Sequence, residues 1–226
     1  LVGLNFAKGL SIALKIPYLG VNHLEGHLYA SFISYPQMKY PYLCLLVTGG
    51  HTQIWEVQSP GEYILHSTTV DDAAGEALDK GAKLLGLDYP GGALLEKHAI
   101  DGDPAWREFP RAFARKPEMR FSFSGLKTSL RYLLEKMSDV EVEDHFHDLC
   151  ASYQAAVMDQ LVAKSRQALE TRSFCSLGLS GGVANNRILR NRFKDLAQRE
   201  SVPLFLAEPR HSGDNAGMIA FAAYME

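Results

Sequence analysis

The sequence predicts a mixed α/β fold, and three observations support this prediction. Short apolar segments with the length of buried strands alternate with longer segments that are apolar at helical spacing. Two strand-like segments run directly into glycine pairs, Gly49-Gly50 and Gly181-Gly182. The second pair leads straight into a helix, which is how many α/β proteins present backbone N–H groups to nucleotides. The sequence contains no repeat of fixed period and no low-complexity tract.

The first third of the chain predicts two helices and four strands. Helices are expected over residues 1–14 and 22–34, where apolar residues recur at helical spacing. Residues 42–48 are apolar and residues 51–57 alternate, so with a glycine turn between them they predict a β-hairpin. The other strands expected here are 18–21 and 63–70.

The remainder of the chain is expected to be mainly helical. Asp71 and Asp72 are candidate N-caps for a helix through Leu87, and residues 89–92 predict a loop. Residues 101–124 are polar, contain prolines and predict irregular structure. The helices expected after this region are 126–137, 140–171 (as one helix or two), 185–199 and one that begins near residue 214. The strands expected between them are 176–179 and 202–207.

Composition limits the class of protein. The 226 residues are 46% hydrophobic and 22% charged, which is ordinary for a globular protein with one large domain or two small ones. A net charge of −3 provides no global basic field, so contact with nucleic acid needs a local patch or a partner's charge. Three widely spaced cysteines without a CxxC pair indicate a reducing compartment. The apolar segments are too short to span a bilayer and no signal peptide leads the chain, so we expect a cytoplasmic protein.

A histidine pair is the clearest candidate for chemistry. His23 and His27 are four residues apart, which places them on one helix face, where both imidazoles can hold a metal ion. Zinc proteases place a glutamate directly after the first histidine, but Leu24 occupies that position here and Glu25 follows one residue later, away from the metal face. The pattern therefore favours a metal site that is not a protease. The plainer interpretation is two polar residues on an exposed helix face.

Asp214 and the glycine pairs each have two interpretations. Asp214 is either the N-cap of the last helix or a third, carboxylate ligand of the metal. Two histidines and one carboxylate suit non-haem iron or catalytic zinc. The glycine pairs are either tight turns or loops whose backbone N–H groups bind an anion such as a phosphate. The spacing around Gly181-Gly182 is not GxGxxG, which disfavours a dinucleotide fold.

Other candidates are less specific. Asp79, inside the helix expected from residue 71, could pair with a ligand hydroxyl. Arg120 and Lys127 bracket a segment of aromatic and hydroxyl residues, which suits contact with RNA or phosphate but also describes a solvated loop. His51 directly follows the glycine pair Gly49-Gly50, so its interpretation lies between a ligand-binding role and a structural one. The remaining histidines lack ligand spacing and predict structural or surface roles.

Seven segments together resemble the universal tRNA threonylcarbamoyladenosine-forming transferase family, known as TsaD in bacteria. They occur in the family's order and cover nearly the whole chain: 23–27, 46–53, 71–80, 84–92, 121–128, 180–187 and 214–215. The resemblance implies an actin-like ATPase (ASKHA) fold with two lobes around a nucleotide cleft. On this basis residues 1–70 are expected to belong to an incomplete N-terminal lobe and residues 71–226 to the C-terminal lobe.

The resemblance also assigns residues to ligands, without identifying a catalytic residue. It implies one divalent metal, Fe²⁺ or Zn²⁺ with Fe²⁺ favoured, on His23, His27 and Asp214. Glu96 stands near a further substrate-contacting position, where relatives often carry Asp. Arg120 and Lys127 are the candidates for tRNA contact. The positions that match substrate-binding residues are Leu46, Val47, Thr48, Gly49, Gly50, Asp79, Gly92 and Asn186.

The activity implied is transfer of a threonylcarbamoyl group from threonylcarbamoyl-adenylate to N6 of the adenosine next to the tRNA anticodon. The alternatives are a metallopeptidase of the glycoprotease type and a non-catalytic actin-like subunit. The implied partners are an actin-like paralogue (TsaB-like), which the helix over residues 1–14 would contact, and an ATPase subunit (TsaE-like), with no membrane. The family's opening strand and its last stretch are missing from the sequence, so we expect a piece of a longer protein.

Overall fold

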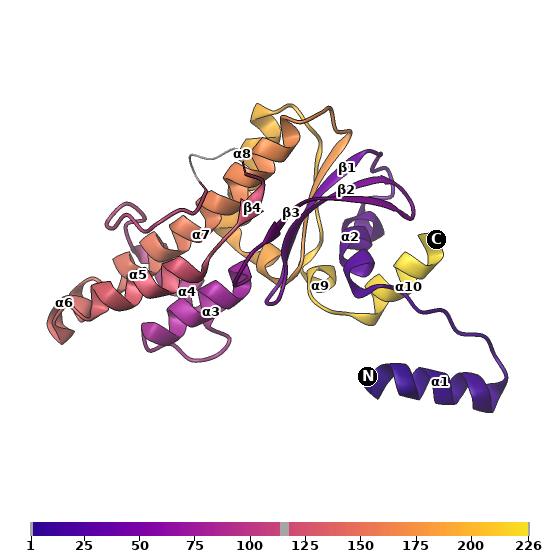
Figure 1. Cartoon of the computed structure of the whole chain (residues 1–226), viewed down its shortest axis with the longest axis horizontal. Helices are drawn as coiled ribbons and strands as arrows, with labels where there is room; N and C mark the ends of the chain where they lie inside the picture. Colours follow the sequence, from indigo (N-terminus) through magenta and orange to yellow (C-terminus); the bar gives the residue numbers. More distant parts are fainter. Residues whose placement is uncertain (1, 114–117, 226) are drawn as a thin grey trace.

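The computed structural model describes residues 2–113 and 118–225, which contain one six-stranded mixed sheet covered by helices (Figure 1). Its strand order is β4-β3-β2-β1-β5-β6. The strands are β1 (Tyr42–Val47), β2 (Thr52–Ser59), β3 (Glu62–Thr69), β4 (Arg120–Phe121), β5 (Ser176–Ser180) and β6 (Leu204–Leu206). The helices are α1 (Val2–Leu14), α2 (His23–Ser34), α3 (Ala74–Leu84), α4 (Gly91–His98), α5 (Ser124–Leu134), α6 (Asp139–Asp144), α7 (Phe146–Leu169), α8 (Arg187–Arg199), α9 (Pro209–Ser212) and α10 (Ala216–Met225), with 3₁₀ turns η1 (Ala99–Asp101) and η2 (Gly182–Asn185).

The centre of the sheet is strand β1. It pairs antiparallel with β2, which confirms the predicted hairpin, and parallel with β5, with Tyr42 opposite Ser176 and Leu46 opposite Ser180. Parallel neighbours end at the same edge of a sheet. The turns that follow β1 and β5, both built on glycine pairs, therefore lie side by side at that edge.

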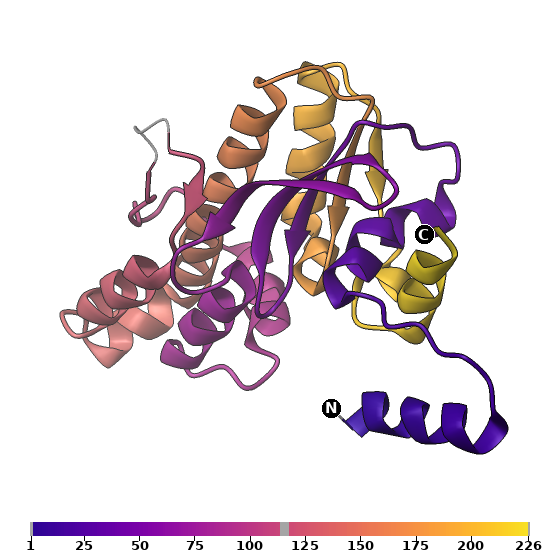
Figure 2. The same cartoon turned by 45° about the vertical axis from the view of Figure 1, so that its right-hand side comes forward.

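Two hydrophobic cores cover the two faces of the sheet, because successive residues of a strand point to opposite faces. Leu43 and Leu45 of β1 pack into the larger core, which α3, α7 and α8 complete. Tyr42 and Cys44 face the smaller core, which α2 and α10 complete. Figure 2 shows α2 and α10 together on their side of the sheet, away from α7 and α8. The packing of α2 against α10 brings the candidate metal ligands together.

Several expected elements differ from the observed ones. Residues 18–21 are not a strand but an exposed connection, which pairs with no strand among the described residues. The N-cap of α3 is Ala73 rather than Asp71 or Asp72, since the Asp71 carboxylate bonds elsewhere. The expected loop at 89–92 instead contains the start of α4. The region expected to be irregular contains β4, with residues 114–117 outside the described part. The helical segment expected over 140–171, as one helix or two, consists of α6 and α7, in agreement with the second form.

Residues on both sides of position 70, where the boundary between the lobes is expected, contribute strands to this sheet. Strands β1 to β3 come from residues 1–70 and strands β4 to β6 from residues 71–226, and all six are hydrogen-bonded in one order. Helix α1 is the part that stands apart (Figures 1 and 2), and none of its described residues is buried. Within the described residues, no helix combines the length and apolarity needed to cross a membrane.

A buried charge cluster holds strand β2 to its surroundings. The Glu56 carboxylate is almost fully buried and lies 2.7 Å from His66 Nε2 and 2.7 Å from Arg172 Nη1. Burial alone raises the pKa of Glu56, but hydrogen bonds from His66 and Gln58 and the charge of Arg172 outweigh it. The net pKa of Glu56 is therefore lower than usual, which means that folding stabilises the ionised carboxylate.

Glu56→Gln is expected to lower the free energy of unfolding at pH 7 by about 2 kcal/mol, because His66 and Arg172 would then contact a neutral amide in place of the buried carboxylate. A lowered folded-state pKa contributes stability above the unfolded pKa of about 4.3, and this stability is lost as the pH falls through the folded value. Urea unfolding should therefore show the difference at pH 7 and a smaller one near pH 3.5. Glu135→Gln, which removes an exposed pair with Arg131, is the control and should change stability by less than about 0.5 kcal/mol. An equal loss at both pH values would contradict the assignment.

Candidate metal centre and ligand cavity

The two histidines lie on the first turns of α2, as the spacing predicts. Asn22 is the N-cap of this helix, and its Oδ1 accepts a hydrogen bond from Leu24 N at 2.9 Å. The capped helix start places both Nε2 atoms toward Asp214, whose Oδ1 lies 3.3 Å from His23 Nε2 and 3.1 Å from His27 Nε2. One ligand atom from each of these residues lies within 4.8 Å of the others.

These separations suit a metal ion. Metal–ligand bonds of about 2.1 Å in tetrahedral geometry put neighbouring donor atoms roughly 3.4 Å apart. The two distances to Asp214 Oδ1 are close to this value. Two imidazoles and one carboxylate on one side of a site leave other positions for solvent or substrate, as in catalytic zinc and non-haem iron centres. The donor set therefore fits the metal that the sequence predicts.

The protonation of His27 also suits a metal ligand. His27 is fully buried, whereas His23 is 49% and Asp214 77% exposed. Burial, with a further contribution from His23, lowers the pKa of His27 despite the opposing effect of Asp214. A neutral imidazole is the form that binds a metal. The three candidate ligands thus comprise one buried residue, His27, and two that solvent can reach, His23 and Asp214.

Asp214 is not the N-cap of α10. Asn215 Oδ1 accepts a hydrogen bond from Met218 N at 2.8 Å, so Asn215 performs the capping of α10. Its Nδ2 donates to Gly213 O at 2.9 Å, which closes the turn around Asp214. The Asp214 carboxylate is left to face the histidines.

A cavity of about 310 Å³ opens beside the glycine turns. Four of the predicted substrate-binding residues, Gly49, Asp79, Gly92 and Asn186, contribute to its wall, as does Glu96. These residues come from the turn after β1 and from α3, α4 and the start of α8. The other residues of the wall are Gly75, Leu78, Pro90, Ala93, Gly182, Val183 and Asn185.

The other predicted substrate-binding residues, Leu46, Val47, Thr48 and Gly50, do not line the cavity. Leu46 and Val47 are fully buried in β1, so their side chains are part of the core. Thr48 closes the turn: its Oγ1 accepts hydrogen bonds from Gly50 N at 3.2 Å and His51 N at 2.9 Å. These two N–H groups are therefore used inside the turn. Among the described residues Gly49 N has no such partner, so it is the donor left for a ligand.

Two glycines shape the floor of the cavity. Gly181 has φ +98°, and a Cβ there would collide with Val47 O, so only glycine lets the turn after β5 pass so close to β1. Gly75 lies close to the turn after β1, where a Cβ would lie 2.6 Å from Thr48 O. The sequence predicted no role for this glycine. A glycine in the first turns of a helix costs helix stability, and this cost is the signal that could have pointed to Gly75.

Hydrogen bonds fix the acidic and amide side chains of the wall. Asp79 Oδ1 accepts from Gly92 N at 2.8 Å, which satisfies a free N–H at the start of α4. Glu96 Oε1 accepts from Arg187 N at 2.7 Å at the start of α8. Asn186 Oδ1 accepts from Leu189 N at 3.0 Å and so caps α8. The starts of α4 and α8 are thus held by residues of the wall, so this part of the cavity is built before any ligand enters.

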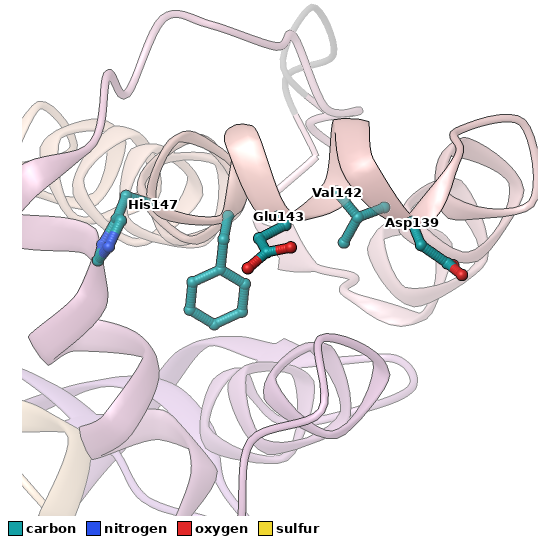
Figure 3. A pocket seen from close by; sticks show the side chains of 5 residues that line it. Asp139, Val142, Glu143 and His147 are labelled. Carbon is teal, nitrogen blue, oxygen red and sulfur yellow. The ribbon is translucent and has the colours of Figure 1, made fainter.

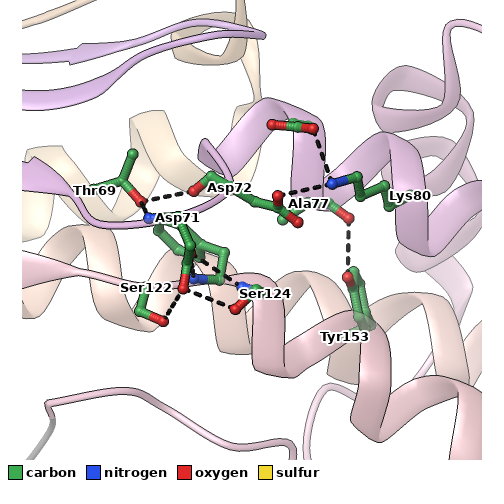
Figure 4. A network of polar contacts seen from close by, with 10 residues as sticks. Thr69, Asp71, Asp72, Ala77, Lys80, Ser122, Ser124 and Tyr153 are labelled. Atoms are coloured by element: carbon green, nitrogen blue, oxygen red, sulfur yellow. Dashed lines mark hydrogen bonds and ion pairs between the residues drawn. The ribbon is translucent and has the colours of Figure 1, made fainter.

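The candidate RNA-contact residues lie elsewhere. Arg120 on β4 and Lys127 on α5 are both exposed and flank the loop 122–123. Figure 4 shows how Asp71 holds this loop. Its carboxylate accepts hydrogen bonds from the Ser122 and Ser124 hydroxyls and from Phe123 N. Asp71 therefore fixes the backbone between the two basic side chains.

A separate hollow lies at the junction of α6 and α7 (Figure 3). It is lined by Asp139, Val142, Glu143, Phe146 and His147. None of these is a predicted site residue, and the hollow does not adjoin the glycine turns.

Comparison with known proteins connects this site to a family. A family model described as "tRNA N6-adenosine threonylcarbamoyltransferase" (TsaD) matches residues 1–221. The chain belongs to this family. The TsaD relatives of that name from Trichlorobacter lovleyi and Kosmotoga olearia are each 46% identical to it, over 98% and 99% of its length. The chain spans about two thirds of these relatives, 65% and 66% respectively.

Solved structures of low sequence identity confirm the fold predicted from the TsaD resemblance. HypF from T. kodakarensis has a TM-score of 0.69 at 13% identity and covers 99% of this chain, which matches 39% of HypF. Component A of the Acidaminococcus fermentans (R)-2-hydroxyglutaryl-CoA dehydratase has a TM-score of 0.53 at 15% identity, over 91% of this chain and 68% of its own. The chain thus has a mixed α/β fold of the actin-like ATPase type. Its TsaD relatives carry the name of a transferase, which disfavours the metallopeptidase alternative.

Proposed function

We propose that the protein containing this chain transfers the threonylcarbamoyl group of threonylcarbamoyl-adenylate to N6 of the adenosine next to the anticodon of tRNA. The observation that carries the proposal is that one cavity wall brings together Gly49, Asp79, Gly92 and Asn186, four positions that the TsaD resemblance assigns to the adenylate. These residues come from the turn after β1 and from α3, α4 and the start of α8.

The chain's own residues would bind and orient the adenylate. The N–H of Gly49 is directed to a phosphate oxygen, and the free oxygen of Asp79 to a ribose hydroxyl. As the N6 amine forms a bond to the carbamoyl carbon, the bond from that carbon to the phosphate oxygen breaks, AMP leaves and the amine loses one proton. We assign no residue to the removal of this proton.

His23, His27 and Asp214 would hold the metal, which when bound supplies a Lewis acid for the carbamoyl or phosphate oxygens. Two histidines and a carboxylate suit both Fe²⁺ and Zn²⁺, and we favour Fe²⁺ because the TsaD resemblance implies it. The exposure of His23 and Asp214 supports a centre that a substrate can reach.

Partners follow from the exposed surfaces. The exposed apolar side chains of α1, such as Val2, Phe6 and Ile12, suit a second actin-like (TsaB-like) subunit. Arg120 and Lys127 are proposed to contact tRNA phosphates, and a TsaE-like ATPase subunit completes the set. A tRNA substrate and three cysteines without a disulfide favour the cytoplasm.

The test uses the full-length protein with its partner subunits, purified threonylcarbamoyl-adenylate and unmodified tRNA. Mass spectrometry of digested tRNA should detect the modified adenosine with the wild type. Asp79→Ala should lower the rate at least about tenfold through weaker adenylate binding. Asp139→Ala, in the separate hollow, should leave the rate unchanged. Peptide hydrolysis that depends on His27, without modified adenosine, would establish the metallopeptidase alternative instead.

A further inference from the structure

We infer that Gln154 is a positioning residue for the ligand cavity: together with Leu189 N, it holds the Asn186 side-chain amide in one orientation. The inference rests on the proposed function, because it assumes that Asn186 contacts the adenylate. Gln154 belongs to none of the motifs that the sequence analysis used. It lies on α7, outside the wall of the cavity.

The contact is direct and buried. Gln154 is only 4% exposed, and its Oε1 accepts a hydrogen bond from Asn186 Nδ2 at 2.7 Å. Asn186 is 5% exposed, and its Oδ1 accepts from Leu189 N. Both ends of the Asn186 amide thus have a defined partner. A buried hydrogen bond of this kind is costly to break because the group left behind has no water to replace its partner.

The two partners exclude the flipped amide. Rotation by 180° would place Asn186 Oδ1 against Gln154 Oε1, which are both acceptors. It would also place Asn186 Nδ2 against Leu189 N, which are both donors. One Nδ2 proton remains after the bond to Gln154. In this inference the remaining proton donates to an acceptor atom of the ligand, such as a ribose oxygen or a ring nitrogen of an adenylate.

The Asn186–Arg187 segment is held from two sides. Gln154 binds Asn186 from α7, and Glu96 accepts from Arg187 N from α4. Gln154, Glu96 and Arg187 also line a second cavity of about 560 Å³. Gln154 thus stands behind the wall and acts on the ligand through Asn186.

The experiment compares two substitutions in the full-length protein with its partners. Gln154→Leu keeps the volume but leaves Asn186 Nδ2 without an acceptor, so KM for threonylcarbamoyl-adenylate should rise about tenfold or more, with a smaller change in kcat. Gln154→Glu keeps the acceptor oxygen, so its KM should stay within about threefold of wild type. The Glu variant keeps the inference testable if the Leu variant does not fold.

Gln160→Leu is the matched control. Gln160 lies on the same helix, is equally buried at 4% exposure, and neither of its amide atoms has a hydrogen-bond partner among the described residues. It should leave KM unchanged. A wild-type KM in Gln154→Leu, or a KM in Gln154→Glu as high as that of Gln154→Leu, would overturn the inference.

A spectroscopic measurement separates this inference from the proposed function. The NMR signals of the Asn186 side-chain NH₂ group should move in Gln154→Leu and not in Gln160→Leu, whether or not adenylate is present. If the wild type binds no adenylate, the proposed function fails. Unmoved Asn186 signals in Gln154→Leu would refute the positioning role by itself.

Discussion

Asp214→Asn is expected to lower the metal affinity of the protein at least about tenfold and to abolish most of the transfer activity. The change keeps the size of the side chain but replaces a charged ligand with a neutral amide. Asp214 is 77% exposed and does not cap α10, so the fold should be retained. Elemental analysis of purified protein, with metal titration, measures the effect.

His27→Ala tests the same centre from the buried side. It removes one of the two imidazoles, and metal affinity should fall on the order of 100-fold or more. Because His27 is fully buried, this variant should also unfold at a lower temperature, which Asp214→Asn should not do beyond the loss of bound metal. His147→Ala, in the hollow at α6 and α7, is the control for histidine content. Full metal content in both Asp214→Asn and His27→Ala would disprove the site.

Gly181→Ala is expected to lower the free energy of unfolding by about 3 kcal/mol and to weaken adenylate binding. An alanine at φ +98° is strained, and its Cβ would collide with Val47 O, so the turn after β5 must move away from β1. This movement displaces η2, which begins at Gly182 and forms part of the cavity wall. Urea unfolding and adenylate titration measure the two effects.

The neighbouring glycine provides the control. A Cβ at Gly182 meets no heavy atom of the described residues within 4 Å, and its φ is not in the left-handed range. Gly182→Ala should therefore change the free energy of unfolding by less than about 1 kcal/mol. Equal losses in both variants would mean that the close approach of the turn to β1 has no special cost.

The sequence predicted those features that short segments determine. Alternation and apolar length located the hairpin of β1 and β2, and the four-residue spacing placed His23 and His27 on one helix face. Asp214, the proposed third metal ligand, had two interpretations in the sequence, N-cap or ligand, and the TsaD resemblance implied the ligand. Its place beside the two histidines depends on the packing of α2 against α10, which no local pattern contains.

Features that depend on contacts between distant segments were missed. Residues 89–92 look like a loop from their proline and glycines, yet Gly91 starts α4 because Asp79 supplies an acceptor to Gly92 N. Asp71 resembles an N-cap but bonds to the loop before α5. Gln154 has no sequence signal, since its role comes from a partner on another helix. In each case tertiary structure decided between local alternatives.

The pairing of β1 with β5 has a consequence for how the protein folds. Tyr42 and Ser176 are neighbours in the sheet but lie far apart in the chain, and loop-closure entropy makes such contacts slow to form. The hairpin of β1 and β2 can form early and locally, but the second glycine turn reaches the first only when the β1–β5 ladder closes. Ligand-binding competence should therefore appear late in refolding, after most of the helical signal, and an adenylate analogue would report the last step of assembly.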